Sequence, residues 1–116
     1  MTNNHHVFDM IIIAGGPAGY TAALYAARAG FDTLVLERLS AGGQMALTHQ
    51  IDNYPGFEDG IDGFSLADKM KKQAERFGAK SKTAGVVRLD LTAEPKRIET
   101  ASETFLSRTV VLATGA

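Results

Sequence analysis

Cysteine is absent from this 116-residue chain, which excludes disulfide bonds, thiolate metal ligands and thiol nucleophiles. Long apolar runs are absent as well. The run that starts at Val7 is interrupted by Asp9 and soon reaches two glycines, whereas a membrane-spanning helix needs about 20 apolar residues. The N-terminus also lacks the basic segment with which a secretory signal begins. We therefore expect a cytoplasmic protein without a membrane partner.

An excess of charge of one sign is missing too. The formal net charge is −1, whereas nucleic-acid and membrane partners favour clustered basic surface, so neither partner is expected. His5 and His6 stand side by side, but no third ligand follows at a useful spacing, and no metal site is predicted. The apolar share of 45% and the charged share of 22% are ordinary for a single soluble globular domain.

The chain begins with a strand–helix–strand pattern. Val7–Ile13 is almost continuously apolar, which is typical of a strand buried on both faces. A sharp turn leads into an alanine-rich helix over residues 17–28, which Gly30 can end. Thr33–Glu37 is predicted as the second strand. A unit of this length predicts two parallel strands joined by a right-handed crossover.

Two helices are predicted with one buried face each. The second helix covers residues 64–77, with Asp62 as its N-cap and Gly78 at its end. Its basic residues Lys69, Lys71 and Lys72 are expected to be solvated on the polar face. The expected buried faces are Ala18, Ala22, Tyr25, Ala26 and Ala29 in the first helix, and Phe64, Ala67, Met70, Ala74 and Phe77 in the second.

The remaining segments are a long loop and three strands. Residues 39–63 show no sustained period, and a loop of that length is usually functional. Segments 85–92, 97–101 and 104–113 follow at hairpin spacing. The last of them ends in apolar residues 110–113, typical of a buried strand. Such a strand at the end of the chain would leave a sheet edge bare, so we expect the chain to be part of a longer domain.

The turn after the first strand matches a dinucleotide-binding pattern in its structural context. Ala14, Gly16 and Gly19 occupy the glycine positions of G-x-G-x-x-G, and Glu37 ends the next strand, where an acid can hold a ribose hydroxyl. Such a turn lets backbone N–H groups and a helix N-terminus approach a pyrophosphate. The alternatives are a glycine turn that only packs helix on sheet and a Glu37 that is simply solvated.

Ala14 departs from this pattern at its first glycine. If the turn requires a positive φ, the Cβ of Ala14 strains the backbone; if it uses an ordinary φ, alanine is tolerated. We expect the strained case, because three glycines are what a pyrophosphate turn usually requires.

The long loop carries the most specific signal. Gly42-Gly43-Gln44-Met45, Thr48 and the run Ile-Asp-Asn-Tyr-Pro-Gly-Phe over 51–57 resemble the flavin-contacting loop of bacterial thioredoxin reductases. The resemblance extends over nearly the whole chain from Val7 onward, including the glycine turn, Gln-Ala-Glu-Arg-Phe-Gly over 73–78 and Ala-Thr-Gly-Ala over 113–116. Amide side chains such as Gln44 and Asn53 offer both donors and acceptors, which suits the mixed polar edge of a flavin. The alternative is a surface loop rich in turn residues.

This resemblance implies both a fold and a function. The fold is α/β, a Rossmann-type parallel sheet with a small three-stranded antiparallel layer, incomplete at its C-terminus. Residues 1–116 would be the N-terminal segment of an FAD-binding domain, without the rest of that domain or the nicotinamide-binding domain. The longer protein would be a thioredoxin-disulfide reductase that passes electrons from NADPH through FAD to thioredoxin. By the same resemblance it would form a homodimer.

Within the chain the resemblance implies cofactor contacts and no catalytic residue. The glycine turn would hold the pyrophosphate, Glu37 the adenosine ribose, and the long loop the flavin. The expected FAD-binding residues are Gly15, Gly16, Pro17, Ala18, Gly19, Glu37, Arg38, Gly42, Gly43, Gln44, Met45, Thr48, Asn53, Val86, Ala113, Thr114 and Gly115.

Two alternative functions remain open at this point. One is the FAD-binding part of a related pyridine nucleotide-disulfide oxidoreductase or ferredoxin-linked flavin reductase. The other is a non-catalytic, excised Rossmann module. Bound flavin, visible in an absorbance scan, separates the second alternative from the others.

The absence of cysteine generates a first prediction. The 116-residue chain alone should show no thioredoxin-dependent oxidation of NADPH, because it has no thiol to reduce a disulfide and no second nucleotide-binding pattern. A spectrophotometric assay that follows the absorbance of reduced nicotinamide checks this. Measurable turnover by a pure sample contradicts the expectation.

Overall fold

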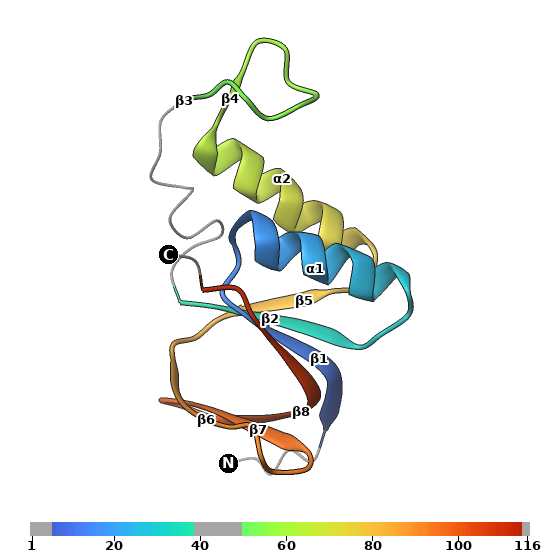
Figure 1. The fold of residues 1–116 in the computed structure, drawn as a ribbon, viewed down its shortest axis with the longest axis vertical. Helices are drawn as coiled ribbons and strands as arrows, with labels where there is room; N and C mark the ends of the chain where they lie inside the picture. The colour runs from blue at the N-terminus through green and yellow to red at the C-terminus, as the bar shows by residue number, and fades with distance from the viewer. Residues whose placement is uncertain (1–5, 39–49, 115–116) are drawn as a thin grey trace.

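The computed structural model of the chain describes residues 6–38 and 50–114. The chain forms a six-stranded sheet, with two helices over the β1–β2 side of one face and a two-stranded ribbon beyond the N-terminal end of the second helix (Figure 1). Across the described residues, no helix combines the length and the apolar character needed to cross a membrane. In chain order the elements are β1 Val7–Ile13, α1 Gly16–Arg28, β2 Thr33–Glu37, β3 Gln50–Ile51, β4 Ile61–Asp62, α2 Gly63–Arg76, β5 Lys80–Thr83, β6 Val86–Asp90, β7 Lys96–Thr100 and β8 Thr104–Leu112.

The large sheet has a parallel part and an antiparallel part that share one strand. Its order is β5-β2-β1-β8-β7-β6. The first four strands are parallel, so that Ile11 of β1 pairs with Leu34 of β2 and with Val110 of β8. β7 then pairs antiparallel with β8, and β6 pairs antiparallel with β7. This confirms the α/β fold with a parallel sheet and a three-stranded antiparallel layer.

The predicted position of the last strand at a bare edge is wrong. β8 lies between β1 and β7, and the two edges of the sheet are β5 and β6. The expected burial of residues 110–113 is also wrong in part. Val110 and Val111 are half-buried and Leu112 is 56% exposed. The helices lie over the β1–β2 side of the sheet (Figure 1), so the end of β8 is covered less completely.

Three strands were not predicted. β5 reads Lys-Ser-Lys-Thr and is mostly exposed, as suits a short, charged edge strand. Such a strand lacks the apolar pattern by which strands are recognised in a sequence. β3 and β4 form a two-stranded ribbon within residues 39–63, which had been expected to be loop.

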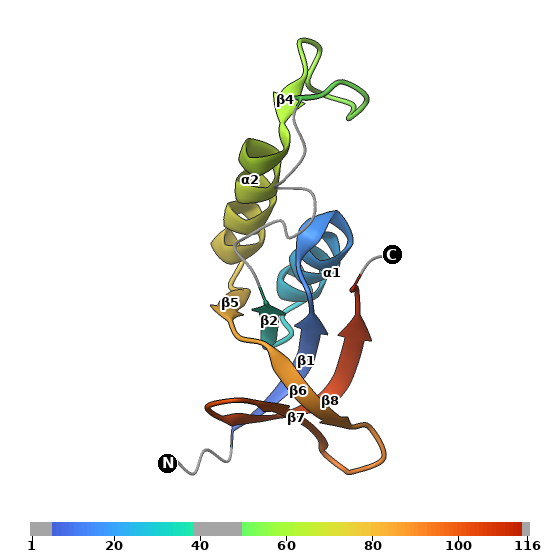
Figure 2. The same cartoon turned by 90° about the vertical axis from the view of Figure 1, so that its left-hand side faces the viewer.

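The core has two parts because β1 is buried on both faces. Ile12 faces the helices with Val35, Tyr20 and Ala23. Ile11 and Ile13 face the other side, as the alternation of side chains along a strand requires. In Figure 2, β6 and β7 run across the lower end of the sheet at an angle to β1. Ile98 of β7 and Phe105 of β8 belong to the part of the core that contains Ile11 and Ile13.

The predicted helix faces are shifted from the observed ones. In α1, Tyr25 is 65% exposed, and in α2, Phe64 is 54% exposed. Short apolar side chains recur so often in α1 that several overlapping stripes fit the helical period, and packing of α1 against both the sheet and α2 selects one. The buried residues are Gly19, Tyr20, Ala23, Ala26 and Ala27 in α1, and Gly63, Leu66, Ala67 and Ala74 in α2.

The predicted helix ends are confirmed. The Asp62 carboxylate accepts a hydrogen bond of 2.9 Å from the backbone N–H of Ser65 and caps α2. Gly30 and Gly78 follow α1 and α2 with φ of +90° and +109°, the left-handed backbone that ends a helix.

Candidate functional site

The turn between β1 and α1 is tight and strained. Ala14 has φ of +80°, so the expectation of a strained backbone at this position is confirmed. Its N–H donates to the carbonyl of Leu36 at 2.8 Å, which ties the turn to β2. Its own carbonyl points at Gly19, where an added Cβ would come within 2.2 Å of the Ala14 oxygen. Gly19 therefore has to be glycine if the turn keeps this shape.

The N-terminus of α1 lacks a capping side chain. Gly15 is its N-cap and makes no side-chain cap hydrogen bond, Pro17 lies in the first turn, and no acidic residue is present there. The first N–H groups of a helix are otherwise unsatisfied and carry partial positive charge. An uncapped N-terminus after a glycine turn is therefore suited to an anionic group such as a phosphate.

Glu37 is buried against this turn. It ends β2, is 4% exposed, and its Oε1 has no hydrogen-bond partner. An added Cβ at Gly15 would lie 1.9 Å from Oε1 and 2.6 Å from the Tyr20 ring. Gly15 is thus held to glycine by its neighbours, although the dinucleotide pattern leaves that position open. The alternative of a solvated Glu37 is wrong.

Burial sets the ionisation of Glu37. Loss of water around the carboxylate raises its pKa, while the backbone N–H of Gly15, which donates to it, and the positive charge of Lys71 act in the opposite direction. A buried carboxylate oxygen without a partner is costly and calls for an explanation. A hydroxyl-bearing ligand that donates to Oε1 would satisfy it.

Glu37 opens on a small polar cavity that sequence reasoning missed. The cavity has a volume of about 30 Å³, enough for one or two water molecules. Burial raises the pKa of the Tyr20 hydroxyl, as do the charges of Glu37 and Glu75, and the hydrogen bond with Ser81 partly offsets this. The residues that line the cavity are Tyr20, Glu37, Lys71, Ser81, Lys82 and Thr83.

One sequence signal could have pointed to this cavity. Tyr20 directly follows the third position of the glycine pattern and is a polar aromatic residue inside an alanine-rich face. Such a tyrosine, when buried, usually finds a polar partner. Lys71 and Ser81 carried no comparable signal, because they come from a solvent-exposed helical pattern and from the unpredicted strand β5.

The C-terminal end of β8 lies beside the same turn. The N–H of Ala113 donates to the carbonyl of Ile13 at 3.0 Å, so Ala113 and the following Thr114 continue next to the end of β1. Arg38 is exposed directly after Glu37, and Val86 is half-buried at the start of β6. The structure therefore brings the glycine turn, Glu37 and residues 113–114 together at the carboxyl ends of parallel strands, where ligands of such folds bind.

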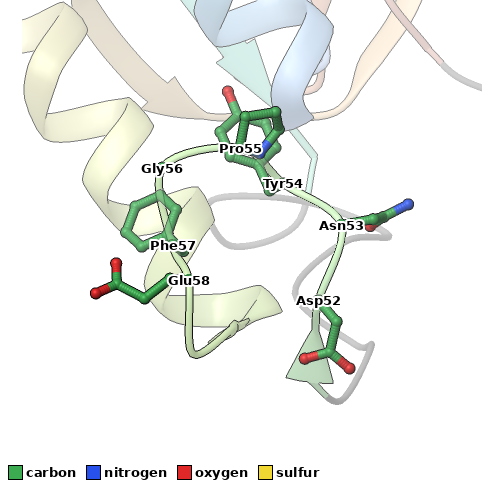
Figure 3. Close-up of a pocket in the computed structure, with 7 residues that line it drawn as sticks. All are labelled: Asp52, Asn53, Tyr54, Pro55, Gly56, Phe57 and Glu58. Atoms are coloured by element: carbon green, nitrogen blue, oxygen red, sulfur yellow. The ribbon is translucent and has the colours of Figure 1, made fainter.

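Asn53 lies elsewhere. It is exposed in the segment between β3 and β4, which projects beyond α2 and away from the β1–α1 turn (Figure 1). Figure 3 shows this segment curled around a hollow of about 360 Å³ lined by residues 52–58. Tyr54 and Phe57 both line it, with their ring centroids 6.1 Å apart.

The predicted residues Gly42, Gly43, Gln44, Met45, Thr48 and Gly115 lie outside the described residues. Within residues 6–38 and 50–114, no group of three or more His, Asp or Glu residues could hold a metal ion.

Comparisons with known proteins agree on one family. The family model of the pyridine nucleotide-disulphide oxidoreductases matches residues 8–116. The chain is 44% identical over 111 residues to the thioredoxin reductase of Aquifex aeolicus and covers 34% of it. It is 45% identical over 116 residues to that of Mycolicibacterium smegmatis and covers 37% of it. These matches take in 95% and 100% of the chain. The chain thus spans about a third of the length of these curated relatives.

Solved structures lead to the same family. A thioredoxin reductase from Gloeobacter violaceus superposes with a TM-score of 0.90 at 44% identity, over 94% of this chain and 34% of that one. The thioredoxin reductase of Lactococcus lactis superposes with a TM-score of 0.88 at 41% identity, over 94% of this chain and 36% of that one. The fold of the chain is therefore the Rossmann-type fold found in thioredoxin reductases.

The strain at Ala14 generates a second prediction. Ala14→Gly should raise the free energy of unfolding by about 1 kcal/mol, because relief of the strained φ, about 1–3 kcal/mol, exceeds the added freedom of the unfolded chain, about 0.4–1 kcal/mol. Denaturant or thermal unfolding measures the difference. The matched control is Ala18→Gly in α1, where the backbone is helical and glycine should destabilise by up to about 1 kcal/mol. Equal losses in both variants would contradict the strain at Ala14.

The buried Glu37 generates a third prediction. Because the folded state raises the pKa of Glu37, it holds the proton more tightly than the unfolded state does. The contribution of Glu37 to stability is therefore full below its unfolded pKa and is lost as pH rises through the folded pKa. Glu37→Gln should remove this loss. The stability of the variant relative to the unsubstituted protein should therefore increase as the pH rises from about 4 to about 8. Unfolding curves at several pH values test this, with the exposed Glu94→Gln as the control that should show no such trend.

Proposed function

The chain belongs to the pyridine nucleotide-disulphide oxidoreductase family, and on that premise we propose that residues 1–116 form the N-terminal segment of the FAD-binding domain of a thioredoxin reductase. One observation carries the proposal. The uncapped N-terminus of α1 and the partnerless carboxylate oxygen of Glu37 lie on either side of Gly15. A pyrophosphate binds to backbone N–H groups such as those at the N-terminus of α1, and a ribose hydroxyl donates to an acceptor such as the Glu37 oxygen.

The pyrophosphate of FAD would lie at the start of α1. It would be surrounded by Gly15, Gly16, Pro17, Ala18 and Gly19. Pro17 has no N–H, and the N–H groups of Gly15 and Gly19 donate to the Glu37 carboxylate and to the Gly15 carbonyl. The N–H groups of Gly16 and Ala18 have no side-chain cap or first-turn acidic residue with which a phosphate would compete. Crowding at Gly15 and Gly19 excludes side chains from these two positions, so a ligand can approach the backbone closely there. The residues present therefore fit a phosphate-bearing cofactor.

The adenosine ribose would be held by Glu37. Its Oε1 is buried and lacks a donor, and ribose hydroxyls are donors. Arg38 and the backbone near Val86 would lie toward the adenine. Ala113 and Thr114, next to Ile13, would pass the cofactor again together with Gly115.

The flavin ring would be contacted by the loop before α2. We assign this role to Gly42, Gly43, Gln44, Met45, Thr48 and Asn53 on their resemblance to the flavin loop of the family. Asn53 lies between β3 and β4, and this ribbon projects away from β2, the strand that Glu37 ends (Figure 1). Such a separation suits a cofactor whose two ends are far apart.

The activity would belong to a longer protein. When bound, FAD supplies a relay for electrons between a reduced nicotinamide and a disulfide. The chain contributes binding groups to that chemistry but no thiol. NADPH and the redox-active cysteine pair would be held by a further domain, thioredoxin would be the substrate, and the protein would work in the cytoplasm as a homodimer. The relatives are thioredoxin reductases and are about three times as long as the chain, which supports this assignment.

The role of Glu37 generates a fourth prediction. Glu37→Ala should weaken FAD binding about ten-fold or more, because the loss of a charged hydrogen-bond partner costs about 1.5–3 kcal/mol. The Kd is measured by titration of the apoprotein with FAD, followed by flavin absorbance or fluorescence, in the full-length protein. Glu94→Ala in the turn between β6 and β7 is the matched control and should leave the Kd unchanged. An unchanged Kd in Glu37→Ala would remove the ribose contact from the proposal.

A further inference from the structure

Lys71 does not behave as the rest of its basic run. Residues 69, 71 and 72 were expected to be solvated on the polar face of α2. Lys69 is exposed, and Lys72 is exposed and paired with Asp68 at 2.9 Å. Lys71 is half-buried and lines the small cavity onto which Glu37 opens. The expectation is therefore wrong for Lys71.

Most other polar groups around this cavity are already engaged. From β5, Lys82 forms an ion pair with Glu103. Ser81, also on β5, donates to Glu75 of α2 at 2.8 Å. Glu75 adds negative charge on this side of the sheet. Their bonds leave these groups little capacity to balance the charge of Glu37.

Tyr20 completes the surroundings of Glu37 from α1. Its hydroxyl is buried, its pKa is raised by that burial, and it stays neutral around physiological pH. Thr83 of β5 is also uncharged. Among residues 6–38 and 50–114, no carboxylate forms an ion pair with Lys71. Lys71 is thus the cation at this cavity whose charge is not already taken up.

We propose that Lys71 is a positioning residue for the adenosine end of the cofactor, in that it keeps the buried Glu37 carboxylate charged and turned to accept ribose hydroxyls. The inference rests on the proposed FAD-binding function. Lys71 acts on Glu37 across a polar cavity that has room for one or two bridging water molecules. A carboxylate with a cation nearby stays ionised, and so remains a hydrogen-bond acceptor, over a wider range of pH than an equally buried carboxylate without one.

The position of Lys71 on α2 gives the inference a structural consequence. The carboxylate is on β2 and the phosphate turn is on α1, whereas the cation comes from the helix that follows the flavin loop in sequence. Both ends of the cofactor would therefore depend on how α2 packs against α1. Ala74 and Met70 of α2 belong to the core shared with Tyr20 and Ala23 of α1, and this packing sets the place of Lys71.

The experiment compares pH profiles of four variants in the full-length protein. Lys71→Met and Lys71→Gln remove the charge, Lys71→Arg keeps it, and Lys69→Met is the matched control on the same helix. The Kd for FAD and the unfolding free energy of the apoprotein are both measured between about pH 4 and pH 8. Removing the charge should move the midpoint of each profile upward by about half a pH unit or more, because Glu37 then protonates at higher pH. At a pH below both midpoints, a shift of about half a unit should weaken FAD binding about three-fold.

The outcomes separate the inference from the function on which it rests. Profiles of Lys71→Arg and Lys69→Met that match the unsubstituted protein support the role of Lys71, as does the loss of any effect of Lys71→Met in a Glu37→Gln background. Unmoved midpoints in both charge-removing variants overturn it, and so does an equal shift in Lys71→Arg or in Lys69→Met. If the unsubstituted protein binds no FAD at any pH, the proposed function fails, and the cofactor role of Lys71 fails with it.

Discussion

The close approach of the Glu37 carboxylate to the backbone of Gly15 organises this structure. It brings the end of β2 against the turn between β1 and α1, and the N–H of Ala14 reinforces the contact through its bond to Leu36. Because β1 is one of the two inner strands in the parallel part of the sheet, this contact sets how α1 leaves the sheet. The direction of α1 in turn determines which face it offers to α2.

Several costly features meet at this contact. Ala14 adopts a backbone conformation that non-glycine residues avoid, α1 begins without a side-chain cap, and Glu37 buries a charged oxygen without a partner. Each is unfavourable in the protein without a ligand. Such costs persist at functional sites because the surrounding fold enforces them. Their coincidence in one turn argues for a ligand that is anionic at one point and rich in hydroxyl groups at another.

The second helix has a larger part in the site than its polar sequence indicates. It carries Lys71 and Glu75 toward the cavity beside Glu37, while its capped start follows the ribbon formed by β3 and β4. β5, which follows it, adds Ser81, Thr83 and an edge to the sheet. The site is therefore built from two supersecondary units. The first carries the glycine-and-acid pattern of a nucleotide site, whereas of the second only the helix was predicted and not β5.

The sequence by itself determined the elements that depend on strong local patterns. Val7–Ile13 and Thr33–Glu37 are found where their apolar runs predicted them, Asp62 caps α2, and Gly30 and Gly78 end the helices. The strand–helix–strand pattern predicted that these two strands are parallel, which brings the glycine turn and Glu37 to the same edge of the sheet. These features could be predicted because burial, helix capping and left-handed backbone each select particular residue types at fixed spacing.

Only the tertiary structure decided the features that depend on partners distant in sequence. The central place of β8, the edge strand β5 and the buried face of α1 follow from how the elements pack, and several alternatives satisfy the same local pattern. The half-buried Lys71 lies at the same cavity as Glu37, which is 34 positions away in the sequence, and Lys71 comes from a helix whose polar pattern resembles that of any solvated surface. Local sequence records the preference of each residue for its own segment, whereas charge balance in a buried cavity depends on which segments meet there.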